Sequence, residues 1–90
     1  MSRIMTEQKR RLTEFIRREV MRNPFVEIEE DTPLVSSGMI DSLALVDIVG
    51  ELENITDMRI PAGKISAEDL ETIRSMFTTV SRVGRPRKRR

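Results

Sequence analysis

Residues 38–46 of this 90-residue chain read Gly-Met-Ile-Asp-Ser-Leu-Ala-Leu-Val, and this stretch decides the predicted fold. A turn residue, Gly38, and a capping residue, Asp41, stand directly before a run of apolar side chains. These apolar side chains recur at i, i+3, i+4 and i+7, the spacing that buries one face of a helix: Leu45, Ile48, Val49 and Leu52. We therefore predict a helix over residues 42–55 that begins directly after Asp41.

The start of this helix admits two interpretations. In the first, Asp41 is an N-cap and Ser42 only occupies the first helical position, which is enough to explain an Asp-Ser pair seen alone. In the second, the unpaired N–H groups and the positive dipole end of the helix favour an anion, so a phosphodiester on Ser42 Oγ would be stabilised there. Gly38 would then provide the turn that exposes the hydroxyl.

On either side of this helix, the same periodicity predicts two further main helices and a short one. The first covers residues 6–22, the short one is capped by Ser66 and Asp69, and the last begins at about Thr72. Residues 23–40 contain Pro, Gly and Ser and are predicted as a long loop. No strand alternation or internal repeat is convincing, so the predicted fold class is all-α, a small bundle of three main helices plus one short helix. The apolar residues expected to bury the first and last helices are Leu12, Phe15, Ile16, Val20, Ile73, Phe77 and Val80, and those expected to pin the loop are Phe25, Val26, Ile28, Leu34, Val35 and Ile40.

Charge is segregated along the chain, although the formal net charge is only +1. Residues 1–26 carry seven basic and three acidic side chains, and residues 27–71 carry twelve acidic and two basic ones. Residues 72–90 carry seven basic side chains and no acidic one. Such segregation bears on partners rather than on fold: the acidic middle is expected to attract basic surfaces and the basic end acidic ones.

The composition excludes several classes of chemistry. Cysteine and histidine are both absent, so the chain offers no disulfide, no thiolate zinc site and no imidazole base. The acidic stretch 27–31 is interpreted as a solvated loop rather than a metal site. No apolar run approaches a membrane span and no signal-peptide core is visible, so we expect a cytoplasmic protein without membrane insertion. A small domain of this size is more typical of a binding or carrier module than of an enzyme.

Several segments together resemble the acyl and peptidyl carrier proteins. They are Asp31-Thr32-Pro33-Leu34 before residues 38–46, then Ile60-Pro61, and then Glu68-Asp69-Leu70-Glu71-Thr72-Ile73 at the entry to the last helix. The resemblance covers roughly residues 6–80, most of the chain. It implies the helical bundle of that family, with its attachment serine at the start of the second of three main helices.

The resemblance implies that Ser42 receives a covalent 4′-phosphopantetheine arm from coenzyme A, with Asp41 as the acidic residue that the family uses at this transfer. The thiol of the arm would carry an acyl or aminoacyl group as a thioester, and the protein itself would catalyse nothing. The implied partners of this monomeric carrier are a phosphopantetheinyl transferase, a loading enzyme and downstream transferases or synthases of fatty acid, polyketide or nonribosomal peptide biosynthesis. The residues expected to contact these partners are Leu43, Val46, Asp47, Gly50 and Glu53.

Residues 82–90 stand apart from the predicted carrier domain, residues 1–81. Six of these nine residues are basic and few can be buried, so we expect a disordered tail. Within it, Gly84-Arg85-Pro86 is similar to the core of an AT-hook, a segment that inserts arginine into the DNA minor groove. The alternative function is therefore a small helical protein that binds nucleic acid through its tail. A third hypothesis, a small enzyme, would use Asp47 and Glu51, one helical turn apart, as an acid–base pair.

Overall fold

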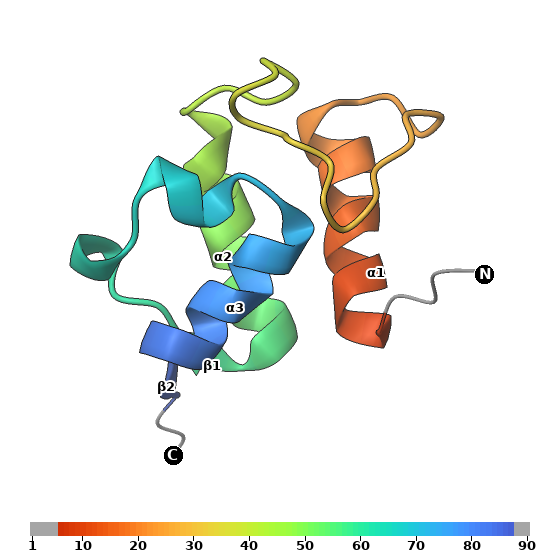
Figure 1. Ribbon diagram of the computed structural model, residues 1–90. Helices are drawn as coiled ribbons and strands as arrows, with labels where there is room; N and C mark the ends of the chain where they lie inside the picture. Colours follow the sequence, from red (N-terminus) through yellow and green to blue (C-terminus); the bar gives the residue numbers. More distant parts are fainter. Residues whose placement is uncertain (1–5, 88–90) are drawn as a thin grey trace.

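The computed structural model describes residues 6–87, and most of this part of the chain packs around three helices (Figure 1). The predicted helical bundle is confirmed, with a two-stranded sheet added to it. The main helices are α1 (Glu7–Phe15), α2 (Ala44–Thr56) and α3 (Ile73–Val83), the short helices are η1 (Ile16–Val20), η2 (Ala62–Lys64) and η3 (Ala67–Leu70), and the strands are β1 (Met58–Arg59) and β2 (Arg85–Pro86).

The first helix begins where the sequence predicts it. Thr6 is its N-cap, because the Thr6 side chain accepts a hydrogen bond from the Lys9 backbone N–H at 3.2 Å. The helix continues without a break from α1 into η1, where its hydrogen bonds widen to the π pattern and Met21 N–H donates to the Ile16 carbonyl. The helix predicted over residues 6–22 is therefore observed over residues 7–20, in two hydrogen-bonding patterns.

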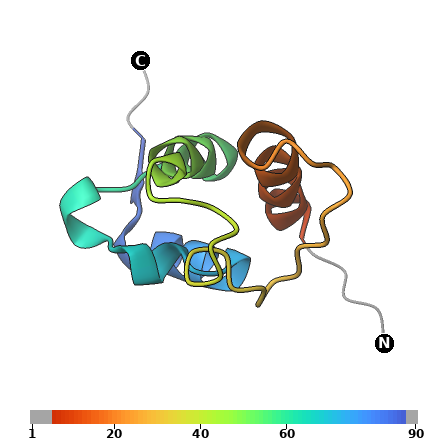
Figure 2. The ribbon, with the colours of Figure 1, turned by 90° about the horizontal axis from the view of Figure 1, so that it is seen from above.

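The three helices share one apolar core. Seen from above, α1, α2 and α3 surround a common centre, and the yellow segment of the long loop passes over it (Figure 2). The predicted inner face of α2 is confirmed, since Ile48 and Leu52 are fully buried there. The largest fully buried side chains of the described residues are Leu12, Ile16, Leu34, Ile48, Leu52, Ile73 and Met76.

The long loop between η1 and α2 is held to the core by buried apolar side chains spaced along it. Ile28, Leu34 and Ile40 are buried, and the Leu34 N–H donates to the Glu71 carbonyl at 2.8 Å. The expectation that Phe25 also pins the loop is wrong: its side chain is 89% exposed. The Phe25 N–H donates to Asn23 Oδ1 at 3.1 Å, and this local turn leaves the ring on the outside.

The predicted disordered tail is also wrong for residues 82–87. The helix α3 extends to Val83, and β2 then pairs antiparallel with β1, so that Met58 faces Pro86 and Arg59 faces Arg85. Residues 88–90 lie outside the described part of the chain. Sequence periodicity could not reveal this β1–β2 ribbon, because two residues per strand are too few to show alternation.

Gly84 makes the turn from α3 into this ribbon possible. Its N–H donates to the Val80 carbonyl at 2.8 Å, and a Cβ at this position would lie only 2.5 Å from that same oxygen. Gly84 and Pro86 therefore serve the ribbon, and the segment is not free to enter a minor groove in the manner of an AT-hook. The alternative function therefore keeps the basic charge of the tail as its support, but not the AT-hook-like motif.

Two glycine-to-alanine changes are expected to shift stability in opposite directions. Gly84→Ala is expected to lower the free energy of unfolding by about 1–3 kcal/mol, because the backbone must move to accept the new methyl group. Gly50→Ala, inside α2 with nothing within 4 Å of its Cβ, is expected to raise it by about 1 kcal/mol. Urea unfolding of both variants measures the two effects. Equal effects of the two changes would contradict the role assigned to Gly84.

Candidate functional site

The candidate site lies where the long loop meets α2. The first helical turn is tight, since the Ala44 N–H donates to the Asp41 carbonyl at 3.2 Å and the Leu45 N–H donates to the Ser42 carbonyl at 3.3 Å. Asp41 Oδ1 also accepts from the Ala44 N–H at 3.1 Å, so Asp41 caps this turn as expected, although the N-cap of the regular helix is Leu43. The regular α-helix begins at Ala44 rather than at Ser42. The N–H groups of Ala44 and Leu45 donate to carbonyls three residues earlier, and not four as in an α-helix.

Ser42 is exposed on this turn. Within the part of the chain that the structure describes, its Oγ has no hydrogen-bond partner, and neither the Ser42 nor the Leu43 backbone N–H has an acceptor. Ile40 anchors the turn to the core. Its side chain is buried, and its N–H donates to the Leu34 carbonyl at 3.0 Å. The site is therefore a free hydroxyl with free N–H groups on an anchored turn, the surroundings that favour a covalently held anion.

Gly38 has the backbone conformation that the sequence predicts for a turn. Its φ is +83°, a left-handed value that side chains with a Cβ rarely adopt, and its N–H donates to the Val35 carbonyl at 3.0 Å. The turn reverses the loop before Ile40 enters the core. Ser42 is consequently carried outward at the beginning of α2.

The loop before the site is fastened to the start of α3 by Ser36 and Glu71. The backbone N–H and the hydroxyl of Ser36 donate to the Glu71 carboxylate at 3.0 and 2.5 Å. These hydrogen bonds, above all the one from the hydroxyl, hold the pKa of Glu71 below its usual value. The sequence contained no signal for this contact, because the two residues are 35 positions apart.

The residues predicted to contact partners are distributed over two parts of α2. Leu43 and Val46 are 84% and 75% exposed, and Asp47 is exposed beside them. Gly50 is half-buried one turn further along. Glu53 is half-buried and its carboxylate accepts a hydrogen bond from the Ile60 N–H at 2.7 Å, so it ties down the chain after α2. The periodic pattern alone could not show that this carboxylate is occupied.

An apolar hollow of about 290 Å³ lies between α2 and the segment that carries η2 and η3. On α2 the hollow begins at Leu45, three residues after Ser42. Sequence reasoning missed its far wall, although the apolar residues after Ile60-Pro61 could have indicated it. The lining residues are Leu45, Val46, Val49, Ala62, Ile65, Ser66, Ala67 and Leu70.

Two carboxylates of the acidic loop form ion pairs with basic side chains of the helices. Glu30 pairs with Lys9 at 3.1 Å, and Asp31 pairs with Arg74 at 2.8 Å, so these two carboxylates join the loop to α1 and α3. Among residues 6–87 no group of three acidic side chains is placed to hold a metal ion. The helices in this described range also include none that is long and apolar enough to cross a membrane.

A small helical bundle whose second main helix starts beside an exposed, unpaired serine has the architecture of a carrier domain. Residues 10–80 match the family model described as "Phosphopantetheine attachment site", and the chain belongs to this family of carrier proteins. The cofactor of the chain is accordingly a covalently attached 4′-phosphopantetheine.

A curated relative points to the same class. The chain is 31% identical over 51 residues to a D-alanyl carrier protein of Streptococcus uberis, a match that spans 57% of this chain and 65% of the relative. No solved structure matches the chain significantly. The predicted fold class, family and cofactor are thus confirmed, while the individual site residues stay predictions.

Proposed function

We propose that Ser42 Oγ holds the 4′-phosphopantetheine arm and that the chain presents an acyl or aminoacyl group on it to partner enzymes. The observation that carries this proposal is the exposed hydroxyl of Ser42, just before α2, which has no hydrogen-bond partner among residues 6–87. The neighbouring serines are engaged in the fold: Ser36 Oγ donates to Glu71, and Ser37 Oγ donates to the Pro33 carbonyl at 2.6 Å. Ser42 is the hydroxyl of this region that is left for chemistry.

The residues around Ser42 suit the group that it would hold. In the transfer, a bond forms between Ser42 Oγ and the phosphorus of the pantetheine phosphate, and the pyrophosphate bond of coenzyme A breaks. 3′-Phosphoadenosine 5′-phosphate leaves, and the serine proton passes to the transferase. The free N–H groups of Ser42 and Leu43 favour the resulting anionic diester, while Asp41 holds the turn through Ala44. When bound, the arm supplies the thiol that a chain without cysteine lacks.

Intact-protein mass spectrometry tests this proposal. We expect one phosphopantetheine mass to be added when the chain is incubated with coenzyme A and a permissive phosphopantetheinyl transferase. Peptide mapping is expected to place that mass on residue 42. Failure of the wild-type protein to gain mass with several such transferases would contradict the proposal.

We infer that partner enzymes approach the arm over Leu43, Val46 and Asp47. Two exposed apolar side chains on adjacent turns form a contact patch, and the Asp47 carboxylate gives its edge a negative charge. Gly50 leaves space on the same side of α2. Glu53 contributes less to this surface, because Ile60 already occupies its carboxylate. The proposal includes a cytoplasmic location, where coenzyme A and its transferase are available.

We also infer that the cargo is short. The hollow beside α2 measures about 290 Å³, just below the roughly 300–1,000 Å³ that ligand pockets occupy. A long acyl chain needs a larger enclosed volume, whereas a short group can remain on the arm in solvent. The relative from Streptococcus uberis is named a D-alanyl carrier protein, which makes an aminoacyl group of that size the first cargo to test.

Thermal unfolding of differently loaded protein separates short from long cargo. A permissive transferase can load the chain directly from acetyl- or hexadecanoyl-coenzyme A. A cargo that binds only the folded state raises the melting temperature, so we expect the two loaded forms to melt within about 2 °C of each other. A rise of more than about 5 °C for the hexadecanoyl form would instead show that the hollow opens to sequester a long chain.

A further inference from the structure

The β1–β2 ribbon carries a basic surface at the end of the molecule opposite Ser42. The helix α2 runs from the candidate site to this ribbon, and its 13 residues separate the two ends by about 20 Å (Figure 1). Arg59 lies on β1, Arg85 lies on β2, and Arg87 follows β2 directly. The carrier chemistry of Ser42 uses none of these three residues.

Arg59 and Arg85 face each other across the two strands, and this pairing of like charges does not stabilise the fold. They lie directly opposite each other in the antiparallel register, and both are exposed. Like charges in this arrangement repel and weaken the pairing of the strands. Neither guanidinium has a hydrogen bond or ion pair with any residue between 6 and 87, whereas Arg82 pairs with Asp69. An anionic surface that meets both side chains would offset this repulsion with favourable contacts.

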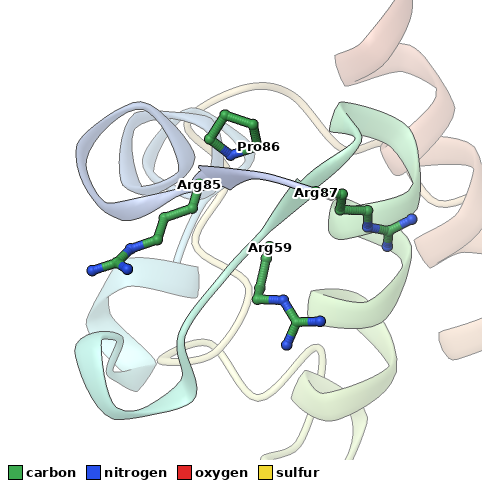
Figure 3. A pocket seen from close by; sticks show the side chains of 4 residues that line it. All are labelled: Arg59, Arg85, Pro86 and Arg87. Atoms are coloured by element: carbon green, nitrogen blue, oxygen red, sulfur yellow. The ribbon is translucent and has the colours of Figure 1, made fainter. Parts of the chain in front are cut away.

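The ribbon offers space for such an anion. Arg59, Arg85, Pro86 and Arg87 line a hollow of about 430 Å³. Figure 3 shows the side chains of Arg59 and Arg85 leaving the ribbon away from the ring of Pro86, with the guanidinium group of Arg85 ending to the left and that of Arg59 to the right. Arg87 is steadied by Asn54 Oδ1 at 3.1 Å and by Asp57 at 4.0 Å. Guanidinium groups attract and hydrogen-bond phosphate oxygens, so the cations around this hollow suit a surface of phosphodiester headgroups.

We propose that the β1–β2 ribbon docks the protein on an anionic lipid surface through Arg59, Arg85 and Arg87. The charge is continued in the sequence by Lys88, Arg89 and Arg90, which follow Arg87. Polybasic clusters of about this size bind anionic bilayers. Because the ribbon lies at the far end of α2, docking there leaves Ser42 directed away from the bilayer and open to partner enzymes.

The chemistry of the ribbon favours a lipid surface over a nucleic acid. Binding to single strands relies on aromatic side chains that stack on bases, and none of the three phenylalanines lines the hollow. Insertion into a minor groove needs a free segment around Arg85, and this segment is paired with β1. The three arginines form a group of cations at one end of the molecule, and such a group can contact several anionic lipid headgroups at once.

Vesicle co-sedimentation of the full chain tests the docking site. The probes are vesicles of pure phosphatidylcholine and vesicles that contain about 30 mol % phosphatidylglycerol. We expect binding only to the anionic vesicles, with its loss when salt is raised from about 0.05 M to about 0.5 M. The double change Arg59→Gln and Arg85→Gln is expected to lower the partition coefficient by about 20- to 30-fold.

Matched variants distinguish a lipid-docking site on the ribbon from general electrostatic attraction to the vesicles. Arg11→Gln with Arg22→Gln removes the same charge from exposed positions at and just after the first helix and is expected to change binding less than about threefold. Arg59→Lys with Arg85→Lys keeps the charge and is expected to retain most of the binding, and circular dichroism shows that each variant is folded. Ser42→Ala is expected to bind vesicles like the wild type, so docking is tested independently of arm attachment.

Three outcomes would overturn the proposal. The first is equal loss of vesicle binding in the two glutamine pairs, which would show unspecific charge attraction. The second is absence of binding to anionic vesicles at low salt. The third is binding of inorganic phosphate or duplex DNA that depends on Arg59 and Arg85 without any vesicle binding, which would identify a different anion as the ligand.

Discussion

Ser42→Ala is expected to abolish the gain of one phosphopantetheine mass completely. The change removes the one oxygen that can form the phosphodiester, and no adjacent residue can replace it in the tight turn between Asp41 and Ala44. The protein should still fold, because the Ser42 hydroxyl has no hydrogen-bond partner among the described residues. Intact mass spectrometry after transferase treatment reads the result, and circular dichroism confirms that the variant is folded.

Ser37→Ala is the matched control for this experiment. Ser37 lies in the same loop, five residues before Ser42, and its hydroxyl bonds to the Pro33 carbonyl. The variant is expected to gain one phosphopantetheine mass as the wild type does, with a loss of stability of about 1 kcal/mol from the lost hydrogen bond. A mass gain in Ser42→Ala, or its loss in Ser37→Ala, would place the arm elsewhere.

Leu34→Ala is expected to give the largest loss of stability, about 2–5 kcal/mol. Leu34 is fully buried although it belongs to a loop, and its truncation leaves a cavity in the shared core. For a domain of this size, each kcal/mol lowers the melting temperature by about 4–8 °C. Urea and thermal unfolding followed by circular dichroism measure the change.

Phe25→Ala is the control in the same loop. It removes a larger side chain, but one that is 89% exposed, so the free energy of unfolding is expected to change by no more than about 0.5 kcal/mol. Both residues are apolar and both were expected to anchor the loop. A similar loss of stability in the two variants would mean that the loop is not held by Leu34 as the structure describes.

The main helices and the cap before α2 could be predicted because their determinants are local. Leu45, Ile48 and Leu52 recur at helical spacing, and all three face the core or border it. Asp41 caps the turn by accepting a hydrogen bond from Ala44, only three residues further along the chain. The family resemblance also rests on short-range motifs and their order, so it could be recognised without coordinates.

Contacts between distant segments were not predictable in this way. The bond between Ser36 and Glu71 and the pairing of Arg59 with Arg85 join residues that share no periodic pattern. Phe25 and Leu34 are both apolar loop residues, and only the path of the chain decides which of them is buried. Likewise, Glu53 is an acidic helix residue in the sequence, but the position of Ile60 turns it into a structural acceptor.

The sequence by itself determined the helical elements, the carrier class and the candidate serine, because spacing, capping and motif order act over a few residues. The tertiary structure decided the rest. It showed that the Ser42 hydroxyl has no partner among the described residues while the neighbouring serines are engaged. It also placed residues 85–86 of the expected tail in a strand, with Arg85 facing Arg59. Which hydroxyls and charges stay unpaired depends on partners far away in the chain, and these partners are set by the packing of the whole domain.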